Sequence, residues 1–198
     1  MKLGIQIGLA IAIIALGYFV YDSVNSKITF EKETKRRSDI VVERLKDIRT
    51  VQMAYKSTKG SYASSFDSLV DFIQNGKISV IKQVGDFDDS VAVAQGLVTR
   101  DTTFINVIDT LFSKTYLQNH LWPFYIDSLP YVPFSDKEKF KIDAGEIEKN
   151  KVKVQVFEVF ASFGQIYKGL PIEDHNIKVG EGLKVGSMTE PSTNGNWE

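Results

Sequence analysis

The feature that most constrains this chain is its opening apolar run, residues 3–21, which reads LGIQIGLAIAIIALGYFVY. The run carries no formal charge, and Gln6 is its single strongly polar side chain. As an α-helix rising about 1.5 Å per residue it is roughly 28 Å long, close to the ~30 Å hydrocarbon core of a bilayer. Because a helix pairs its own backbone groups in lipid, residues 1–21 are predicted to be a transmembrane anchor. The anchor residues singled out are Leu3, Gln6, Ile14, Tyr18, Phe19 and Tyr21.

A cleaved secretory signal is the alternative interpretation of this run. Such signals have a shorter apolar part, about 7–15 residues, followed by a small-residue cleavage site. Here the run ends in Tyr18, Phe19 and Tyr21, and no Ala-x-Ala follows. Aromatic side chains favour the headgroup level of a membrane. We therefore interpret the run as a retained anchor of a single-pass protein in the cytoplasmic (inner) membrane.

The charges that flank the anchor support two opposite orientations in the membrane. The positive-inside rule would place the basic cluster after the helix in the cytoplasm. A two-residue start with one Lys is instead typical of a bacterial signal anchor whose body is exported, and we predict a periplasmic C-terminal domain. A cytoplasm-facing domain remains the alternative. The basic residues that follow the helix are Lys27, Lys32, Lys35, Arg36 and Arg37.

Charge divides the remaining chain into a basic stem and an acidic body. Residues 27–59 contain ten Lys or Arg against five Asp or Glu, whereas residues from 60 onward contain thirteen against nineteen. We assign residues 22–60 to the stem and its amphipathic helix, 61–187 to a soluble α+β domain, and 188–198 to a flexible tail. The acidic body argues against nucleic acid as a partner. Membrane lipid is an expected partner, and the basic segment beside the bilayer either attracts anionic headgroups or an acidic protein, or is simply a solvated helix face. The chain has no cysteine, which excludes disulfides, thiol nucleophiles and Cys-ligated metals.

Apolar residues at spacings of three and four predict an amphipathic helix over residues 38–59. Its charged side chains, Arg44 and Asp47 among them, are expected largely on the other faces. No Pro or Gly lies between residues 21 and 60, so one continuous rod is compatible with the sequence, with residues 28–30 as the place where it could break. The stripe predicted to pack on a sheet is Val41, Leu45, Ile48 and Tyr55.

The body shows a short helix followed by strand patterns. Ser64 and Asp67 fit a capping box before this helix. Strands are expected at residues 78–84, 102–111 and 152–156, with 140–142 as the hairpin partner of the last, and a short helical turn at 90–96. The predicted fold class is therefore α+β: an N-terminal transmembrane helix running into a long amphipathic helix packed on an antiparallel sheet.

The end of the amphipathic helix reads DIRTVQMAYKSTKGSY. Together with the apolar helix before it and the short helix and strands after it, this stretch resembles type IV pilin-like proteins, especially type II secretion pseudopilins. The chain has no cleavage Gly followed by Phe-Thr-Leu-Ile-Glu, so processing and polymerisation stay open. It also resembles small singly anchored envelope proteins of Bacteroidota, a likeness that implies no activity. The residues that match the pseudopilin pattern are Gln52, Ala54, Tyr55, Gly60 and Tyr62.

Residues able to carry chemistry are few. His120 and His175 are far apart in the sequence and lack a second His or Cys nearby, so no metal or catalytic set is predicted. Asp86, Asp88 and Asp89 form an acidic cluster without EF-hand spacing, which is typical of a solvated turn rather than a calcium site. No cofactor and no small-molecule substrate are predicted.

The function predicted from these features is that of a noncatalytic, membrane-anchored extracytoplasmic subunit of a cell-envelope assembly, pilin-like in layout. Its expected partners are other envelope proteins, including further copies of itself. A membrane-anchored envelope enzyme and a cytoplasm-facing adaptor are the alternatives. An aromatic-rich loop over residues 122–134 is a candidate partner surface, although core packing explains it as well. Its aromatic residues are Trp122, Phe124, Tyr125, Tyr131 and Phe134.

Overall fold

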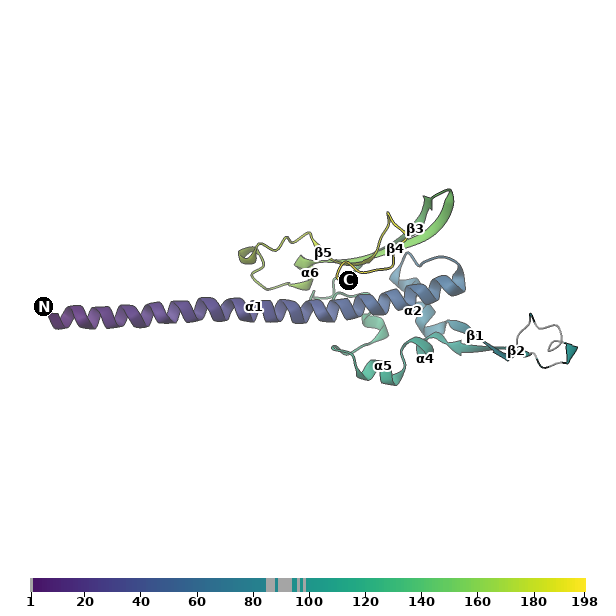
Figure 1. Ribbon diagram of the computed structural model, residues 1–198, viewed down its shortest axis with the longest axis horizontal. Coiled ribbons are helices and arrows are strands. Elements are labelled where there is room, and N and C mark those ends of the chain that lie inside the picture. Colours follow the sequence, from purple (N-terminus) through teal and green to yellow (C-terminus); the bar gives the residue numbers. More distant parts are fainter. Residues whose placement is uncertain (1, 85–87, 89–93, 96, 98) are drawn as a thin grey trace.

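In the computed structural model, helix α1 (Lys2–Lys59) is unbroken, and the rest of the chain folds around its C-terminal half (Figure 1). The structure describes residues 2–84, 88, 94, 95, 97 and 99–198. Residues 28–30, where a break was considered, are helical. The helix ends at Gly60, which adopts a left-handed φ of 83° and donates its N–H to the carbonyl of Lys56. Glycine reaches this conformation without the steric cost of a Cβ.

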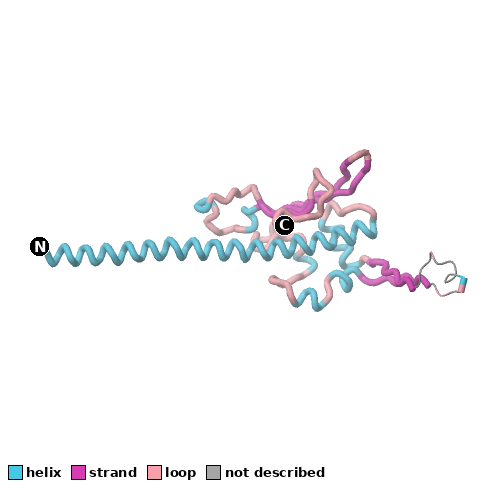
Figure 2. The backbone as a smooth tube through the Cα atoms, in the orientation of Figure 1, coloured by secondary structure: helices cyan, strands magenta, loops and turns pink. Residues whose placement is uncertain are grey.

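Two groups of elements lie on opposite sides of α1. Strands β3, β4 and β5 cover one side, and α4, α5 and the loop after α5 lie on the other (Figures 1 and 2). The N-terminal half of α1 extends beyond both groups. The bounds of the elements after α1 are α2 (Phe66–Asn75), β1 (Lys77–Val84), β2 (Thr99–Asn106), α4 (Val107–Leu111), α5 (Lys114–Gln118), η1 (Ile126–Ser128), β3 (Lys141–Lys149), β4 (Val152–Ser162), α6 (Phe163–Ile166), η2 (Glu173–His175) and β5 (Gly182–Gly186).

The sheet beside α1 is antiparallel, with β4 between β3 and β5. Strands β3 and β4 are joined by Asn150 and Lys151, whose φ values of 53° and 65° suit the two-residue turn that matches strand twist. The predicted hairpin forms, but with longer strands: residues 145–149 pair with the expected strand 152–156, and residues 141 and 142 pair beyond it, with Phe160 and Val159. At the end of β5, a Cβ on Gly186 would overlap the carbonyl of Phe157, so the close approach of these backbones requires glycine.

Strands β1 and β2 form a separate antiparallel hairpin that points away from the N-terminal end of α1 (Figure 1). The strand predicted over residues 102–111 is therefore only partly correct, because it ends at Asn106 and α4 begins at Val107. Val107 is fully buried, and its N–H donates to the carbonyl of Gly76. This contact draws the chain off the hairpin and into the core. The helical turn expected at residues 90–96 falls largely outside the described residues.

The N-cap of helix α2 lies one residue after the predicted one. The N-cap is Ser65, whose Oγ accepts from the N–H of Ser68, and not Ser64. The helix buries Leu69, Phe72 and Ile73. The expected short helix therefore forms, with its cap shifted by one position.

The hydrophobic core lies where α1, α2 and the sheet meet. Val41, Leu45 and Ile48 are fully buried and belong to the same cluster as Val159 and Val185. Burial of each such aliphatic side chain stabilises the fold by roughly 1.5–3 kcal/mol. The C-terminal half of α1 is thus the central element of the folded body.

A second stripe of α1 is buried as well, which corrects the expectation that its charged residues face outward. Ile40, Arg44, Asp47 and Val51 follow one another at spacings of three and four, and all are buried. Other parts of the protein pack on both sides of α1. The face next to the apolar stripe is therefore covered by α5 and the loop that follows it.

The C-terminal segment, residues 188–198, is docked on the body, in contrast to the flexible tail predicted from its composition. Gly195 forms a β-bridge with Val185, and the partly buried Trp197 packs on the core. Glu198 pairs with Arg49 of α1 at 2.7 Å. These contacts tie the end of the chain to both β5 and α1.

Candidate functional site

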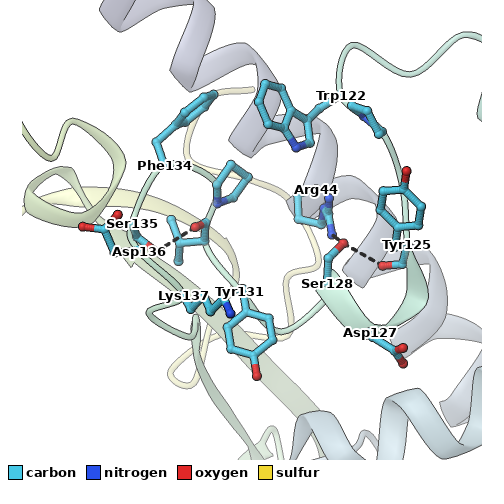
Figure 3. Close-up of a pocket in the computed structure, with 13 residues that line it drawn as sticks. Arg44, Trp122, Tyr125, Asp127, Ser128, Tyr131, Phe134, Ser135, Asp136 and Lys137 are labelled. Carbon is cyan, nitrogen blue, oxygen red and sulfur yellow. Dashed lines mark hydrogen bonds between the residues drawn. The ribbon is translucent and has the colours of Figure 1, made fainter.

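The loop after α5 and helix α1 together form an open pocket of about 450 Å³ (Figure 3). The pocket is lined by the candidate aromatic residues Trp122, Tyr125, Tyr131 and Phe134, and by Arg44 of α1. Its size lies within the range of about 300–1,000 Å³ that small-ligand sites occupy. The predicted partner surface is therefore a hollow, with a charged side chain from the central helix at its wall.

Arg44 is fixed in this wall by the loop itself. Its Nη1 donates to Ser128 Oγ at 2.9 Å, and Ser128 Oγ donates to the carbonyl of Tyr125 at 2.7 Å (Figure 3). The guanidinium also lies over the ring of Phe124, 5.4 Å from its centroid. Arg44 is only 5 % exposed. Burial lowers its pKa, although the charges of Asp47 and Glu43 oppose the shift; arginine nevertheless stays charged.

Within the part of the chain that the structure describes, Arg44 has no carboxylate at ion-pair distance. A guanidinium offers five N–H donors, and one hydrogen bond uses only one of them. Among those same residues, Trp197 Nε1 is the buried side-chain nitrogen left without a partner. The unused nitrogens of Arg44 are therefore not fully buried, and Arg44 is one of the residues that line the pocket.

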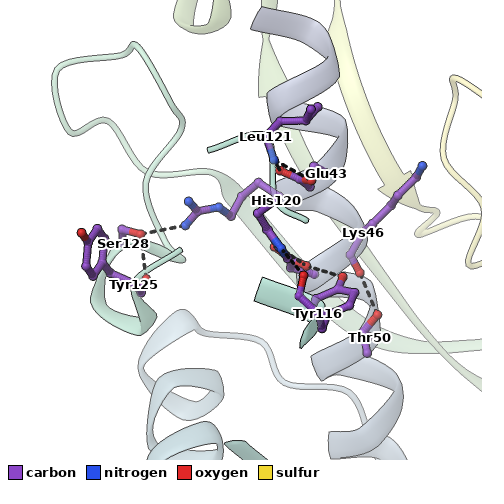
Figure 4. Close-up of polar contacts among 10 residues, drawn as sticks. Glu43, Lys46, Thr50, Tyr116, His120, Leu121, Tyr125 and Ser128 are labelled. Atoms are coloured by element: carbon purple, nitrogen blue, oxygen red, sulfur yellow. Dashed lines mark hydrogen bonds and ion pairs between the residues drawn. The ribbon is translucent and has the colours of Figure 1, made fainter. Parts of the chain in front are cut away.

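A polar cluster beside the pocket attaches α5 to α1 (Figure 4). Asp47, fully buried, accepts a hydrogen bond from the Tyr116 hydroxyl at 2.8 Å and lies 3.0 Å from His120 Nε2. Burial raises the pKa of Asp47, and the hydrogen bonds from Tyr116 and His120 oppose that rise. Burial together with the Asp47 contact raises the pKa of Tyr116.

The hydrogen bonds of His120 determine how protons are distributed in this cluster. Nδ1 lies 3.2 Å from the carbonyl oxygen of Tyr116, and Nε2 faces the Asp47 carboxyl. A carbonyl oxygen only accepts, so Nδ1 carries a hydrogen. The Nε2 contact then needs a second hydrogen, either on the ring or on Asp47. The two side chains therefore share one proton between them.

The loop is fastened to α1 at a second point by Glu43, whose carboxylate accepts from the backbone N–H of Leu121 at 2.9 and 3.1 Å (Figure 4). Hydrogen bonds to a charged acceptor are stronger than neutral ones. With Asp47, this contact sets where the chain leaves α5 and enters the pocket wall.

The predicted aromatic residues divide between packing and exposure. Phe124 stacks on Phe112 with ring centroids 4.4 Å apart, and Trp122 meets Phe134 edge-on at 5.1 Å. Trp122 and Tyr125 remain 40 % and 68 % exposed. These two rings are open to solvent, whereas Phe124 supports the wall from behind.

Phe134 and Tyr131 complete the pocket and lie half-buried. The Phe134 ring is covered by the guanidinium groups of Arg36 and Arg37, at 5.1 and 4.9 Å. Both arginines also pair with Glu33. Their hydrogen bonds lower the pKa of Glu33 to about 2, and the bond from Arg36 has the larger effect. The basic residues of the stem therefore take part in holding the loop.

The other predicted site residues lie elsewhere. Tyr55 is half-buried and meets Phe72 of α2 edge-on, 5.2 Å between centroids. The side chain of Leu3 is outside what the structure describes, as are Asp86 and Asp89. His175 stacks on Phe30 at 3.7 Å. Exposed anchor side chains are Gln6, Ile14, Tyr18, Phe19 and Tyr21.

Residues 2–84, 88, 94, 95, 97 and 99–198 contain no group of three or more His, Cys, Asp or Glu placed to hold a metal ion. Sequence reasoning missed Arg44, Asp47 and His120 as a set. The signal that could have found them is the spacing of Ile40, Arg44, Asp47 and Val51, which puts two charges on a partly apolar stripe.

No family model matches the chain, and neither a curated protein nor a solved structure matches it. Within the described residues, α1 is the one helix that is long and apolar enough to cross a membrane. Its most apolar stretch of 18 residues has a mean hydropathy of 1.9, and none of that stretch is buried in the protein.

Proposed function

We propose that this chain is a single-span membrane protein that holds a noncatalytic binding domain at the membrane surface, as a subunit of a cell-envelope assembly. The observation that carries the proposal is the uncovered apolar part of α1. Ile7, Ile14, Phe19 and Tyr21 are 55–72 % exposed, although an apolar side chain gains roughly 1.5–3 kcal/mol by leaving water. Over a whole helical segment this is a strong drive into lipid.

The same helix sets the distance between the domain and the bilayer. Phe30, the first buried residue of α1 among those whose burial is described, lies nine positions after Tyr21, which is roughly 14 Å of helix. A headgroup layer is about 5–8 Å thick on each side of the hydrocarbon core. The body therefore stands close to the membrane surface on a rigid support, an arrangement that resembles the pilin-like layout.

Membrane extraction of the full chain tests the anchor. We expect the protein to stay in the membrane pellet after alkaline carbonate treatment. Replacing both Ile11 and Ile14 with Lys should release it, because each buried charge at the centre of a span costs about 2.5–3.5 kcal/mol. The control is Val80→Lys on the exposed face of β1, which should change nothing. Release of the unaltered chain into the soluble fraction would overturn the proposal.

Protease protection tests the direction of export. In spheroplasts of a Gram-negative host, we expect added protease to digest the body without lysis. A body that is digested only after lysis would place it in the cytoplasm and support the adaptor alternative. A reporter fused after Glu198 gives an independent readout of the same question.

A further inference from the structure

We propose that the pocket beside Arg44 binds a carboxylate group attached to an apolar or aromatic body. The proposal rests on the binding role proposed for the domain but not on its membrane attachment. It starts from the charge of Arg44, a residue that is almost fully buried and has one hydrogen bond, to Ser128. The charges of Asp47 and Glu43 act on Arg44 without contacting it. An anion that reaches the unused nitrogens would add the direct, charge-assisted hydrogen bonds that neither of them makes.

The two acidic residues nearest to Arg44 on α1 are engaged elsewhere. Asp47 is bound to Tyr116 and His120, and Glu43 accepts from the N–H of Leu121 (Figure 4). Their charges act on Arg44 through space, but neither occupies its open nitrogens. The guanidinium therefore retains donors that match the two oxygens of a carboxylate.

The charges around the pocket favour a carboxylate over a phosphate. Asp127 and Asp136 also line it. Asp136 pairs with Lys168 at 3.3 Å, and Asp127 accepts from the side-chain amide of Gln74 at 3.4 Å. Two acidic side chains would repel a phosphate with nearly two negative charges more strongly than a carboxylate with one. Lys137 lines the pocket as well, so two positive and two negative side chains balance there, and a singly charged ligand adds less excess negative charge than a phosphate does.

The aromatic residues of the remaining wall favour an apolar or aromatic group next to the carboxylate of the ligand. Trp122 and Phe134 form an edge-on pair, and Tyr125 presents a ring that is 68 % exposed (Figure 3). Apolar and aromatic groups gain from contact with such rings because both surfaces leave water. Free aromatic acids and the C-terminal residue of a polypeptide share this chemistry, and both fit the proposal.

Ligand titration of the detergent-solubilised full chain tests the proposal, with binding followed by ligand-observed NMR. The probes are 3-phenylpropanoate and its neutral amide, which differ only in the charged group. We expect the acid to bind about tenfold or more tightly than the amide, since a hydrogen bond to a charged group contributes roughly 1.5–3 kcal/mol. N-Acetylphenylalanine and its amide form a second pair, and tighter binding of that acid would identify a peptide C-terminus as the source.

Variants assign the effect to the pocket. Arg44→Gln should remove the preference for the acid, and Trp122→Ala should weaken the acid and the amide alike. The matched control is Arg49→Gln, an arginine on the same helix that pairs with Glu198 outside the pocket, and it should bind as the parent does. If Arg44→Gln does not fold, Ser128→Ala takes its place, with a smaller loss of preference expected.

Equal binding of the acid and the amide by the parent would overturn the proposal, as would an unchanged preference in Arg44→Gln. No detectable binding of any probe at 20 mM would overturn it as well. None of these results changes the carbonate extraction outcome, so failure of the ligand proposal is distinguishable from failure of the proposed anchoring.

Discussion

Gln52 connects the end of α1 to the chain that follows it. Its side-chain amide is fully buried, donates to the carbonyl of Ala63 at 2.8 Å and accepts from the Ala63 N–H at 2.9 Å. This pair of bonds satisfies both backbone groups of a residue that is 3 % exposed. The Gln-x-Ala-Tyr stretch that supports the pilin-like resemblance thus has a structural role in this fold.

Gln52→Ala is expected to lower the free energy of unfolding by about 2–4 kcal/mol, because it leaves a buried N–H and a buried carbonyl without partners. Urea denaturation of the detergent-solubilised chain, followed by tryptophan fluorescence, measures the change. Thr50→Ala on the exposed face of α1 is the control and should cost under about 0.5 kcal/mol. A loss of similar size in both variants would mean that the Ala63 contacts contribute little.

Asp47→Asn tests the proton shared with His120. Because burial raises the pKa of Asp47, the folded chain holds this proton more tightly than the unfolded chain does. The stability that the proton contributes is fully present below the pKa of Asp47 in the unfolded chain, about 3.9. It is lost as pH rises through the pKa of Asp47 in the folded chain. An asparagine amide can donate to a neutral Nε2 and accept from Tyr116 without a titrating proton of its own, so the variant should lack the pH dependence that the Asp47 carboxyl contributes.

The measurement is the difference in free energy of unfolding between parent and Asp47→Asn from pH 4 to pH 8.5. We expect the advantage of the parent to fall as pH rises. The titratable and charged groups that act on Asp47 are Tyr116 and His120 across from α1, and Arg44 on α1 itself. A difference that is constant or grows with pH would contradict the shared proton.

The burial of Asp47 and Arg44 could not be predicted from the residues of the helix alone. The apolar stripe through Val41, Leu45 and Ile48 was predictable because its spacing follows the helical period, and these residues are buried. The adjacent stripe contains charges, and a charge on a helix is usually solvated. Its burial depends on α5 and the loop after it, whose position no local pattern encodes.

Elements were predictable where local rules and tertiary contacts agree. The β3–β4 hairpin has alternating valines and an Asn-containing turn, and it forms as expected. The stretch from residue 102 to 111 is rich in β-branched residues throughout, yet it changes to helix at Val107. Strand propensity continues past that point, but burial of Val107 beside Gly76 outweighs it.

The C-terminal segment is a second element in which local composition and tertiary contacts disagree. Removing residues 194–198 deletes the bridge to Val185, the packing of Trp197 and the ion pair with Arg49. We expect a loss of about 2–4 kcal/mol in unfolding free energy, dominated by the tryptophan, since large-to-small changes at packed aromatic sites cost up to about 3–5 kcal/mol.

Circular dichroism during urea denaturation provides the measurement, because the truncation also removes a fluorophore. Glu198→Gln serves as the control and should cost less than about 1 kcal/mol, as exposed ion pairs do. A truncated chain as stable as the parent would show that the segment behaves as the flexible tail its composition suggests.

At the scale of the whole molecule, α1 joins two environments that differ in what covers the helix. Its C-terminal half lies between the sheet and the loop side, and its N-terminal half extends beyond the body (Figure 1). The edge of the body nearest to the N-terminal half of α1 is closed by Phe30, which stacks on His175. The sequence indicated the length and apolar nature of the first half, but not that the helix would continue unbroken through residues 28–30.

A rigid, inserted rod makes a quantitative prediction about height above the bilayer. Because the chain has no cysteine, single cysteines can be placed at Ser26, Lys35 and Lys59, all exposed on α1. Measured from Tyr21 along the helix, these positions lie roughly 8, 21 and 57 Å from the hydrocarbon edge. Nitroxide labels in vesicles carrying nickel-chelating headgroups report collision with the membrane surface.

We expect strong collision at Ser26, weak collision at Lys35 and none at Lys59, because headgroups extend only about 5–8 Å beyond the hydrocarbon. A helix that broke at residues 28–30 would let the body tilt onto the surface, so Lys35 and Lys59 would collide to a similar degree. A protein that did not insert at all would give equal, low values at all three labels. The graded pattern alone requires both insertion and an unbroken helix, the two properties on which display of the pocket at a fixed height depends.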